Sequence, residues 1–409
     1  MAEENPQQLA WPAPGTIVPV MDPLVVDKGV TLLTRHADVL AVLRSKSASS
    51  ERTKLDPAKV PEGFTDRRES PPEVLELFEG SEGRDVSFLF RDPPDHTRLR
   101  GIVSKAFTPK MVRQLEPQIR GIAQRLVNEA LERGGEVDFL ADVAYPLPVE
   151  VISRMMGIPE HDDQQFLAWS AALARSLDPD PTLSEQDIAI RDEAELAIAT
   201  YLKDLIDHRR DHRGDDLISA LVDAEDEGKR LTAGEVLATS ILLLIAGHET
   251  TVNLITGGAL TLAQRPDDQA KLRQERNLLR TGVEEMVRFV SPVGSDGRSL
   301  IGDIELDGGH VLEQGTFALM LLSAANRDAS VFDRADVFDV TRDPNPHLGF
   351  GFGIHHCLGS PLARLEAQAT FDVLLSSTRS FELTTDEVRW RPNLVLRGLE
   401  ELPLRLSAS

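Results

Sequence analysis

The longest run of apolar positions in the chain predicts one long central helix. Thr232 and Glu235 stand three residues apart and form a capping pair that is typical of a helix start. Apolar residues then recur from Val236 to Leu260, and the pattern stops before Pro266. This spacing predicts a helix of about 30 residues and roughly 45 Å. Because the helix is apolar on most sides, we expect it to lie at the centre of the fold.

The middle of this predicted helix breaks the apolar pattern. Gly247, His248, Glu249, Thr250 and Thr251 follow one another there. A buried helix normally avoids glycine, acids and hydroxyl groups, because glycine destabilises a helix and unpaired polar groups are costly to bury. A local exception of this kind points to a functional site.

The rest of the pattern indicates a helix-rich chain. Apolar residues recur at three and four spacing in 111–132 and 185–210, so the region from 109 to 264 is expected to be mostly helical. Runs rich in β-branched residues at 31–34 and 305–312 predict short strands. No repeat, low-complexity tract or Gly/Ser linker divides the chain. The expected fold is mainly α with small β-sheets, in a single domain that spans residues 1–409.

Composition and charge narrow the classes of function. Hydrophobic residues at 41% and charged residues at 27% are ordinary for a globular protein, and a net charge of −23 argues against nucleic acid as a partner. Residues 1–32 hold no apolar run long enough for a signal peptide or a membrane anchor, so we expect a cytoplasmic protein. The segment 96–115 is basic and free of acids, which is usually the sign of a solvated helix face.

Cys357 is the only cysteine, which excludes internal disulfides. It stands in a glycine-rich stretch, 350–359, just ahead of a helix expected to begin near Pro361. The free N–H groups and the positive dipole end of a helix N-terminus lower the pKa of a nearby thiol and favour the metal-binding thiolate. A lone cysteine is more often buried and inert, so the surrounding loop decides between these interpretations.

A zinc site is the alternative interpretation of the same residues. His248 and Glu249 begin like the zinc-protease motif His-Glu-x-x-His, but Val252 stands where the second histidine is required. A site made from Cys357, His355 and His356 lacks the fourth ligand of a structural zinc site. The number of ligands therefore disfavours zinc.

Four motifs, in order along the chain, resemble those of the cytochrome P450 (heme-thiolate monooxygenase) family in its soluble bacterial form. Residues 350–359 are similar at every fixed position to the heme-binding loop Phe-x-x-Gly-x-His-x-Cys-x-Gly. Residues 246–251 resemble the oxygen-activating groove of the family's long central helix. Residues 285–288 resemble its Glu-x-x-Arg pair, and residues 96–100 resemble its His-x-x-x-Arg.

This resemblance implies heme b (iron protoporphyrin IX) as the cofactor, with Cys357 as the axial metal ligand. Thr250 and Glu249 would be the catalytic residues, which direct and relay protons to the oxygen. The remaining residues implied by the resemblance are His96, Arg100, Arg298 and His355 for the heme propionates, Phe350 and Ala246 as further cofactor contacts, and Val293, Gly294 and Ala246 for the substrate pocket.

Glu285 and Arg288 lie one helical turn apart and, taken alone, would be an ordinary surface ion pair. The resemblance implies instead a buried structural pair that clamps the segment before the cysteine loop. His347 and Arg342 are both candidates for its third partner. The stretch 333–338 departs from the family's usual proline-arginine element, so the sequence leaves this choice open.

The resemblance implies that one atom of O2 is inserted into a small apolar organic substrate, with electrons from NAD(P)H. The chain carries no Gly-x-Gly-x-x-Gly fingerprint for a nicotinamide or flavin. An iron-sulfur ferredoxin and its reductase are therefore the expected electron donors. The alternatives are a peroxide-using heme-thiolate enzyme and a heme-binding sensor without turnover, and the presence of both Glu249 and Thr250 disfavours each of them.

Overall fold

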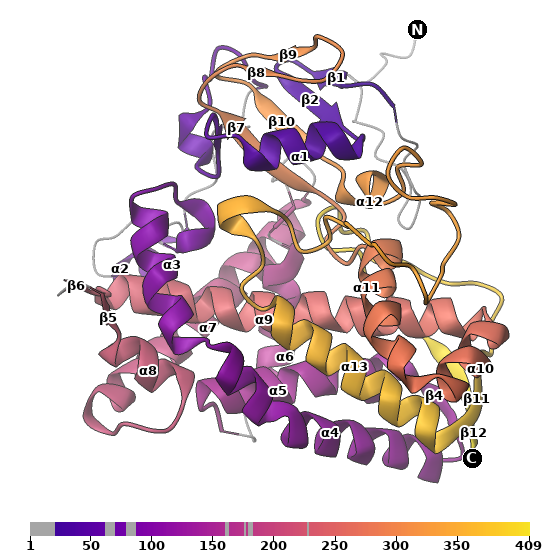
Figure 1. Ribbon diagram of the computed structural model, residues 1–409. Coiled ribbons are helices and arrows are strands. Elements are labelled where there is room, and N and C mark those ends of the chain that lie inside the picture. Colours follow the sequence, from indigo (N-terminus) through magenta and orange to yellow (C-terminus); the bar gives the residue numbers. More distant parts are fainter. Residues whose placement is uncertain are drawn as a thin grey trace, which may run out of the picture.

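The computed structural model describes residues 21–61, 70–78, 87–159, 163–175, 177–178, 183–226 and 229–409. Figure 1 shows a helical body with a smaller β-region at one end, as the mainly α prediction requires. The described helices are α1 (His36–Arg44), α2 (Pro72–Leu77), α3 (Asp95–Ala106), α4 (Pro109–Glu132), α5 (Pro146–Met156), α6 (Asp163–Arg175), α7 (Glu185–Asp211), α8 (Leu217–Asp223), α9 (Ala233–Ala263), α10 (Pro266–Gln274), α11 (Leu279–Val290), α12 (Leu322–Ala325) and α13 (Ser360–Ser377).

Helix α9 is the predicted central helix. The side chain of Thr232 accepts a hydrogen bond from the backbone N–H of Glu235 at 3.2 Å, and the Glu235 carboxylate accepts one from the N–H of Thr232 at 2.8 Å. The helix contacts α5, α6, α7, α11 and α13, and Figure 1 shows it running through the helical body. In the described part of the chain it alone is long and apolar enough to span a bilayer, but 72% of its most apolar stretch is buried in the fold. Packing among helices accounts for its apolar surface.

Helix α13 carries the chain away from the cysteine loop and fixes the position of that loop relative to α9. Pro361 lies in its first turn, where the missing N–H would have no helical partner. The helix packs along α4 and also contacts α9 and α11. A Cβ atom at Gly258 of α9 would lie 2.8 Å from Cζ of Phe371, so α9 and α13 approach each other closely because Gly258 has no side chain.

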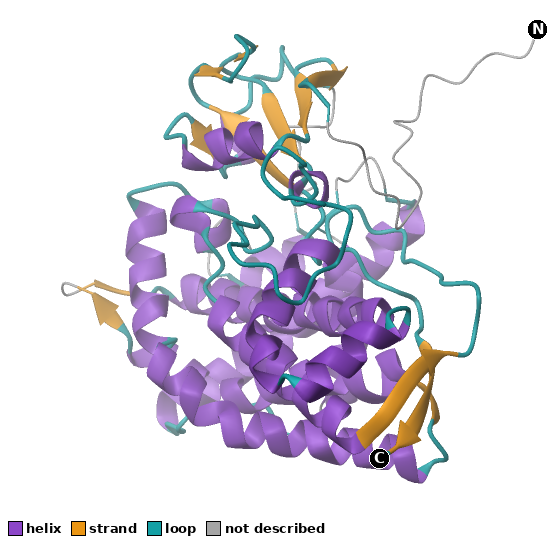
Figure 2. Cartoon of the chain, turned by 45° about the vertical axis from the view of Figure 1, so that its right-hand side comes forward, coloured by secondary structure: helices purple, strands orange, loops and turns teal. Residues whose placement is uncertain are grey.

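The strands form small sheets, which Figure 2 shows at the edges of the helical body. The largest has the order β1-β2-β10-β7-β3, and β10 pairs parallel with β2 and antiparallel with β7. The described strands are β1 (Leu24–Asp27), β2 (Val30–Leu33), β3 (Ala48–Ser49), β4 (Glu136–Asp138), β5 (Glu225–Asp226), β6 (Lys229–Arg230), β7 (Asp296–Leu300), β8 (Ile304–Glu305), β9 (Val311–Leu312), β10 (Phe317–Met320), β11 (Thr378–Leu383) and β12 (Pro403–Ala408).

The two strand predictions had different outcomes. The run at 31–34 is confirmed as β2. The run at 305–312 was wrong as one strand, because it contains a chain reversal between β8 and β9, which pair antiparallel. Gly308 and Gly309 have φ of +96° and +82°, a backbone conformation that favours glycine and turns the chain back.

Candidate active site

A cavity of about 560 Å³ lies between α9 and the cysteine loop. Helix α9 contributes Ala246, Gly247 and Thr250 to its wall, and the loop contributes Phe350 and Cys357. Much of the remaining wall is aliphatic and comes from distant parts of the sequence, including Leu173, Leu177, Val293, Leu394, Val395 and Leu396. The cavity therefore joins a side that carries reactive groups to a wide apolar side, an arrangement that suits an apolar small molecule.

The backbone of the cysteine loop holds Cys357 at the cavity wall. The N–H of Cys357 donates to the carbonyl of Phe350 at 2.9 Å, and the N–H of His356 donates to the carbonyl of Gly353 at 3.1 Å. Gly353 has φ of +73°, and a Cβ atom there would lie 2.8 Å from the carbonyl oxygen of Leu43. This position therefore requires glycine, and the glycine-rich stretch is explained by the close turn.

The predicted effect of the helix N-terminus on Cys357 is present but is outweighed. Burial raises the pKa of the Cys357 thiol, and the backbone N–H of Gly359, the Arg100 guanidinium and the backbone N–H of Ser360 oppose that rise. The side chain is exposed to the cavity, but the surrounding protein atoms keep bulk water away from the sulfur. The helix N-terminus therefore acts in the predicted direction, but burial acts more strongly. A metal cation bound to the sulfur would deprotonate it outright.

Positively charged and neutral basic groups gather at one edge of the cavity. Arg100, Arg298 and His355 line it, and His96 lies behind His355 with the ring centroids 4.4 Å apart. Burial, followed by repulsion from Arg298, His96 and Arg100, lowers the pKa of His355 to about 3. Burial and Arg100 lower the pKa of His96, whose ring nitrogens make no hydrogen bond to the described residues. Asp296 pairs with Arg298 at 2.7 Å. The remaining groups have no ion pair with the described residues.

These features fit a heme. The basic groups at the cavity edge have the chemistry to hold carboxylates, because charge-assisted hydrogen bonds are the strongest that such groups make. Cys357 could supply a thiolate to the iron, and Phe350 and Ala246 line the walls on either side. His96 does not line the cavity, but its buried, unpartnered ring nitrogens stand one ring behind it.

The polar residues of α9 point in different directions. Thr250 lines the cavity and its hydroxyl donates to the carbonyl of Ala246 at 3.1 Å. Glu249 is 1% exposed and does not line the cavity. One of its carboxylate oxygens lies 3.4 Å from Nη1 of Arg391, and the other has no hydrogen-bond partner in the described chain. The structure does not bring these two side chains together, so a proton passing between them requires water or a side-chain rotation.

Gly247 has a packing role that the sequence did not reveal. The resemblance assigned the Ala246-Gly247 pair to an oxygen-activating groove. A Cβ atom at Gly247 would lie 2.9 Å from Cδ1 of Ile152, so the missing side chain lets α5 pack closely against α9. Glycine at this position is therefore explained by the approach of two helices as well as by the cavity.

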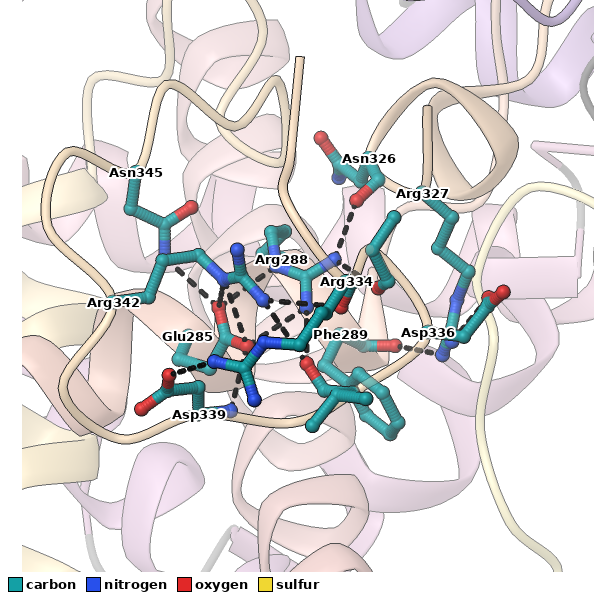
Figure 3. A network of polar contacts seen from close by, with 12 residues as sticks. Glu285, Arg288, Phe289, Asn326, Arg327, Arg334, Asp336, Asp339, Arg342 and Asn345 are labelled. Atoms are coloured by element: carbon teal, nitrogen blue, oxygen red, sulfur yellow. Dashed lines mark hydrogen bonds and ion pairs between the residues drawn. The ribbon is translucent and has the colours of Figure 1, made fainter. Parts of the chain in front are cut away.

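A buried polar network surrounds Glu285 and Arg288 of α11, both of which are 0% exposed. Arg288 donates to both carboxylate oxygens of Glu285 at 2.8 and 2.7 Å. Arg342 donates to the same carboxylate at 3.0 Å, and Figure 3 shows it beside the pair. The third partner is therefore Arg342. His347 instead contacts the neighbouring Glu284, at 3.1 Å.

This network also holds the segment that precedes the cysteine loop. Nη1 of Arg288 donates to the carbonyls of Asn326 and Ala335 at 2.8 and 2.7 Å. The side chain of Asn326 in turn accepts the N–H of Leu348 at 2.7 Å. The network thus holds the backbone at Asn326, Ala335 and Leu348, within the segment that leads into the loop of Cys357.

The substrate-pocket predictions had mixed outcomes. Val293 and Ala246 line the cavity, but Gly294 does not. Gly294 is buried against Arg397, where a Cβ atom would lie 3.0 Å from the arginine side chain. The segment from Arg391 to Leu396, which supplies part of the cavity wall and the partner of Glu249, was missed. It has no motif and no periodicity, so only its position in space reveals its role.

Three comparisons with known proteins agree with this geometry. The family model described as "Cytochrome P450" matches residues 62–394 of the chain. The chain is 38% identical over 379 residues to the polyketide biosynthesis cytochrome P450 PksS of Bacillus subtilis, with 92% of this chain and 89% of that protein covered.

Solved structures give the same result. The structure of P450BioI in complex with an acyl carrier protein ligated to hexadec-9Z-enoic acid is similar with a TM-score of 0.81 and 37% identity, covering 92% of each chain. CYP109E1 from Bacillus megaterium in complex with testosterone is similar with a TM-score of 0.77 and 33% identity, covering 92% of this chain and 93% of that one.

Proposed function

This chain belongs to the cytochrome P450 family, and from that premise we propose that it inserts one atom of O2 into a large apolar substrate such as an acyl chain or a steroid. It is a monooxygenase with heme b as its cofactor. One observation carries the proposal: Cys357 and Thr250 line the same cavity from opposite elements, and most of the other lining residues are apolar. The relatives with an acyl group or testosterone bound support the substrate class.

Each residue of the site has a proposed role in this reaction. Cys357 would hold the iron, and Arg100, Arg298 and His355 would hold the carboxylates of the cofactor. When bound, a heme with a thiolate ligand supplies the oxygen activation, because the thiolate donates electron density to the iron and favours O–O cleavage. Thr250 would donate a hydrogen bond at the reaction centre, and Glu249 would supply protons to it from the Arg391 side. The aliphatic wall would exclude water and orient the substrate.

The substitution Thr250→Ala tests this assignment. The variant should still bind substrate and consume NADH. Product formed per NADH should fall and peroxide should rise, because the hydroxyl that directs protons to the reaction centre is lost. The carbon monoxide spectrum of the reduced protein should keep the thiolate-type band. Unchanged coupling would leave Thr250 with a packing role only, and a histidine-type band in fresh protein would remove Cys357 as the ligand.

A second experiment, which compares added peroxide with NADH and O2 as the source of oxygen, separates the competing functions. A peroxide-using enzyme would form product from added peroxide as fast as from NADH and O2, and a sensor would form none. A monooxygenase should form product with NADH, a ferredoxin and its reductase. We propose a ferredoxin and its reductase as partners, because the sequence carries no Gly-x-Gly-x-x-Gly fingerprint for a nicotinamide or flavin, and we propose the cytoplasm as the location.

An exposed basic surface supports an acidic ferredoxin as the donor. Lys105, Lys110 and Arg113 are exposed, and so are Phe352 and Ile354 of the cysteine loop. Attraction between a basic and an acidic surface accelerates association and weakens as salt rises. Charge reversal at Lys105, Lys110 and Arg113 should slow the first reduction several-fold at low salt, whereas Arg405→Glu on β12 should not. An unchanged rate with unchanged salt dependence would exclude this surface.

A further inference from the structure

Asp178, just after α6, is a buried carboxylate with no part in the chemistry described above. Its side chain is 0% exposed, and carboxylates are seldom fully buried unless paired. Its oxygens accept the backbone N–H of Leu394 at 3.0 and 3.1 Å and the N–H of Val395 at 2.8 Å. It also pairs with Arg175 of α6. This carboxylate therefore binds the backbone of a segment more than 200 residues further along the chain.

Arg175 extends the same connection. Its Nη1 pairs with Asp178 and also donates to the carbonyl of Pro392 at 3.0 Å. The end of α6 thus binds the segment 392–395 at one backbone carbonyl, that of Pro392, and at two backbone N–H groups, those of Leu394 and Val395. A connection of this kind fixes the path of the backbone and not only the position of one side chain.

The opposite side of that segment is held by a different set of bonds. Gly294 N–H donates to the carbonyl of Val395 at 2.8 Å, Arg397 N–H donates to the carbonyl of Pro292 at 2.9 Å, and Val293 pairs with Leu396. These bonds run between backbone atoms, and the hydroxyl of Ser295 also donates to the carbonyl of Leu394 at 3.3 Å. On the α6 side, by contrast, the bonds depend on the charged side chains of Asp178 and Arg175.

The segment held between these two sides forms part of the cavity wall. Leu394, Val395 and Leu396 line the cavity, and so do Leu173 and Leu177 on the α6 side and Val293 on the other. A displacement of the 394–396 backbone would therefore move three aliphatic side chains that face the substrate. We call the part of the cavity that these aliphatic side chains line the apolar chamber, and the path of this backbone affects its width.

We infer that Asp178 is a positioning residue for substrate selection, which sets the shape of the chamber by holding the backbone of Leu394 and Val395. This inference rests on the proposed monooxygenase function for its substrate class. The carboxylate acts through the wall and touches no reacting atom. Its loss should therefore change the binding of bulky apolar substrates and leave the steps at the heme unchanged.

Asp178→Asn tests the inference with little change in volume. The asparagine Oδ1 could still accept from both backbone N–H groups, but the N–H₂ group would lie against the N–H of Leu394 and against Arg175, whose ion pair would be lost. We expect dissociation constants for testosterone and hexadec-9Z-enoic acid, measured by optical titration of the ferric holoenzyme, to rise about tenfold, as expected for an unpaired buried group. The difference between the two ligands should shrink. Heme content, the carbon monoxide band and the rate of the first reduction should stay unchanged.

Two further variants complete the test. Asp207→Asn removes a surface carboxylate of α7 that pairs with Lys203, and it should change none of these readouts. Arg175→Gln keeps the bonds of the carboxylate to Leu394 and Val395 but weakens the bond to Pro392, so its effect should go in the same direction and be smaller. If Asp178→Asn does not retain heme, Arg175→Gln becomes the deciding variant.

The inference is overturned if the variant that retains heme binds both ligands as the parent does, even where its melting temperature falls. It is also overturned if affinity is unchanged and only the rate of chemistry falls. Failure of the proposed function looks different, because the parent protein would then bind ligands in the optical titration and yet form no product with NADH and a ferredoxin.

Discussion

Two clusters of ionisable side chains in this protein differ in whether their partners are present in the chain. Around Glu285, the carboxylate accepts hydrogen bonds from Arg288, Arg342, Asn345 and the backbone N–H of Asp339. At the cavity edge, Arg100, His355 and His96 have no ion pair with the described residues, and repulsion among basic groups contributes to the low pKa of His355. Glu285 and Arg288 are fully buried, whereas Arg100 and His355 are partly buried, and only the first cluster is neutralised by its own side chains. The difference separates a structural role from a binding role, because buried charge without a partner is unfavourable until a ligand supplies one.

The largest expected effect is on the free energy of unfolding, when the carboxylate at the centre of the Glu285 cluster is removed. Glu285→Ala leaves the guanidinium groups of Arg288 and Arg342 inside the protein without their carboxylate. Loss of one partner of a buried pair typically costs about 3–5 kcal/mol, so the variant should unfold at a much lower urea concentration and retain little heme. Glu129→Ala, which removes an exposed partner of Arg125, should change the free energy of unfolding by about 0.5 kcal/mol or less. A loss below about 1 kcal/mol in Glu285→Ala would contradict the comparison.

At the cavity edge we expect a smaller effect, and we expect it on heme binding and not on the stability of the heme-free protein. Arg298→Gln removes a cation that repels His355 and also the partner of Asp296, whose side chain is 34% exposed, so the protein without heme should lose little stability. The holoprotein should lose heme to an acceptor about tenfold faster, because one hydrogen bond to a charged group is worth roughly 1.5 kcal/mol. Arg405→Gln on the remote strand β12 serves as the control. If Arg298→Gln destabilises the heme-free protein as much as the holoprotein, then Arg298 belongs to the structural class.

Glu284 is an intermediate case between the two clusters, because its carboxylate has partners in the chain but is partly exposed. Burial alone would raise its pKa, but hydrogen bonds from His347 and Arg364 outweigh burial and lower the pKa to about 2. A lowered carboxylate pKa adds stability above the unfolded-state value near 4.5, and that stability is lost as the pH falls toward 2. Because the side chain is 23% exposed, solvent screening should limit the contribution to about 1 kcal/mol. Urea midpoints between pH 5 and pH 2.5 should fall less steeply in Glu284→Gln, and parallel curves would refute the assignment.

The sequence by itself determined the features that depend on neighbouring residues. The capping pair of Thr232 and Glu235 and the apolar run of α9 predicted the central helix almost to its ends, because capping bonds and helical periodicity act within a few residues. The family followed in the same way from short motifs such as the loop around Cys357. The hairpin of β8 and β9 was missed although Gly308 and Gly309 are adjacent in the sequence, since the apolar pattern on both sides resembles one strand.

The tertiary structure decided everything that depends on which distant segments meet. Arg342 and His347 were equal candidates for Glu285 until the backbone between them placed one at Glu285 and the other at Glu284. The contacts of Asp178 with Leu394 and of Glu249 with Arg391 join segments separated by more than 140 residues. Burial, which decides the direction of the pKa shift of Cys357, is likewise a sum over atoms from the whole fold. Such contacts leave no local pattern, because many different pairs of segments could bury the same residues.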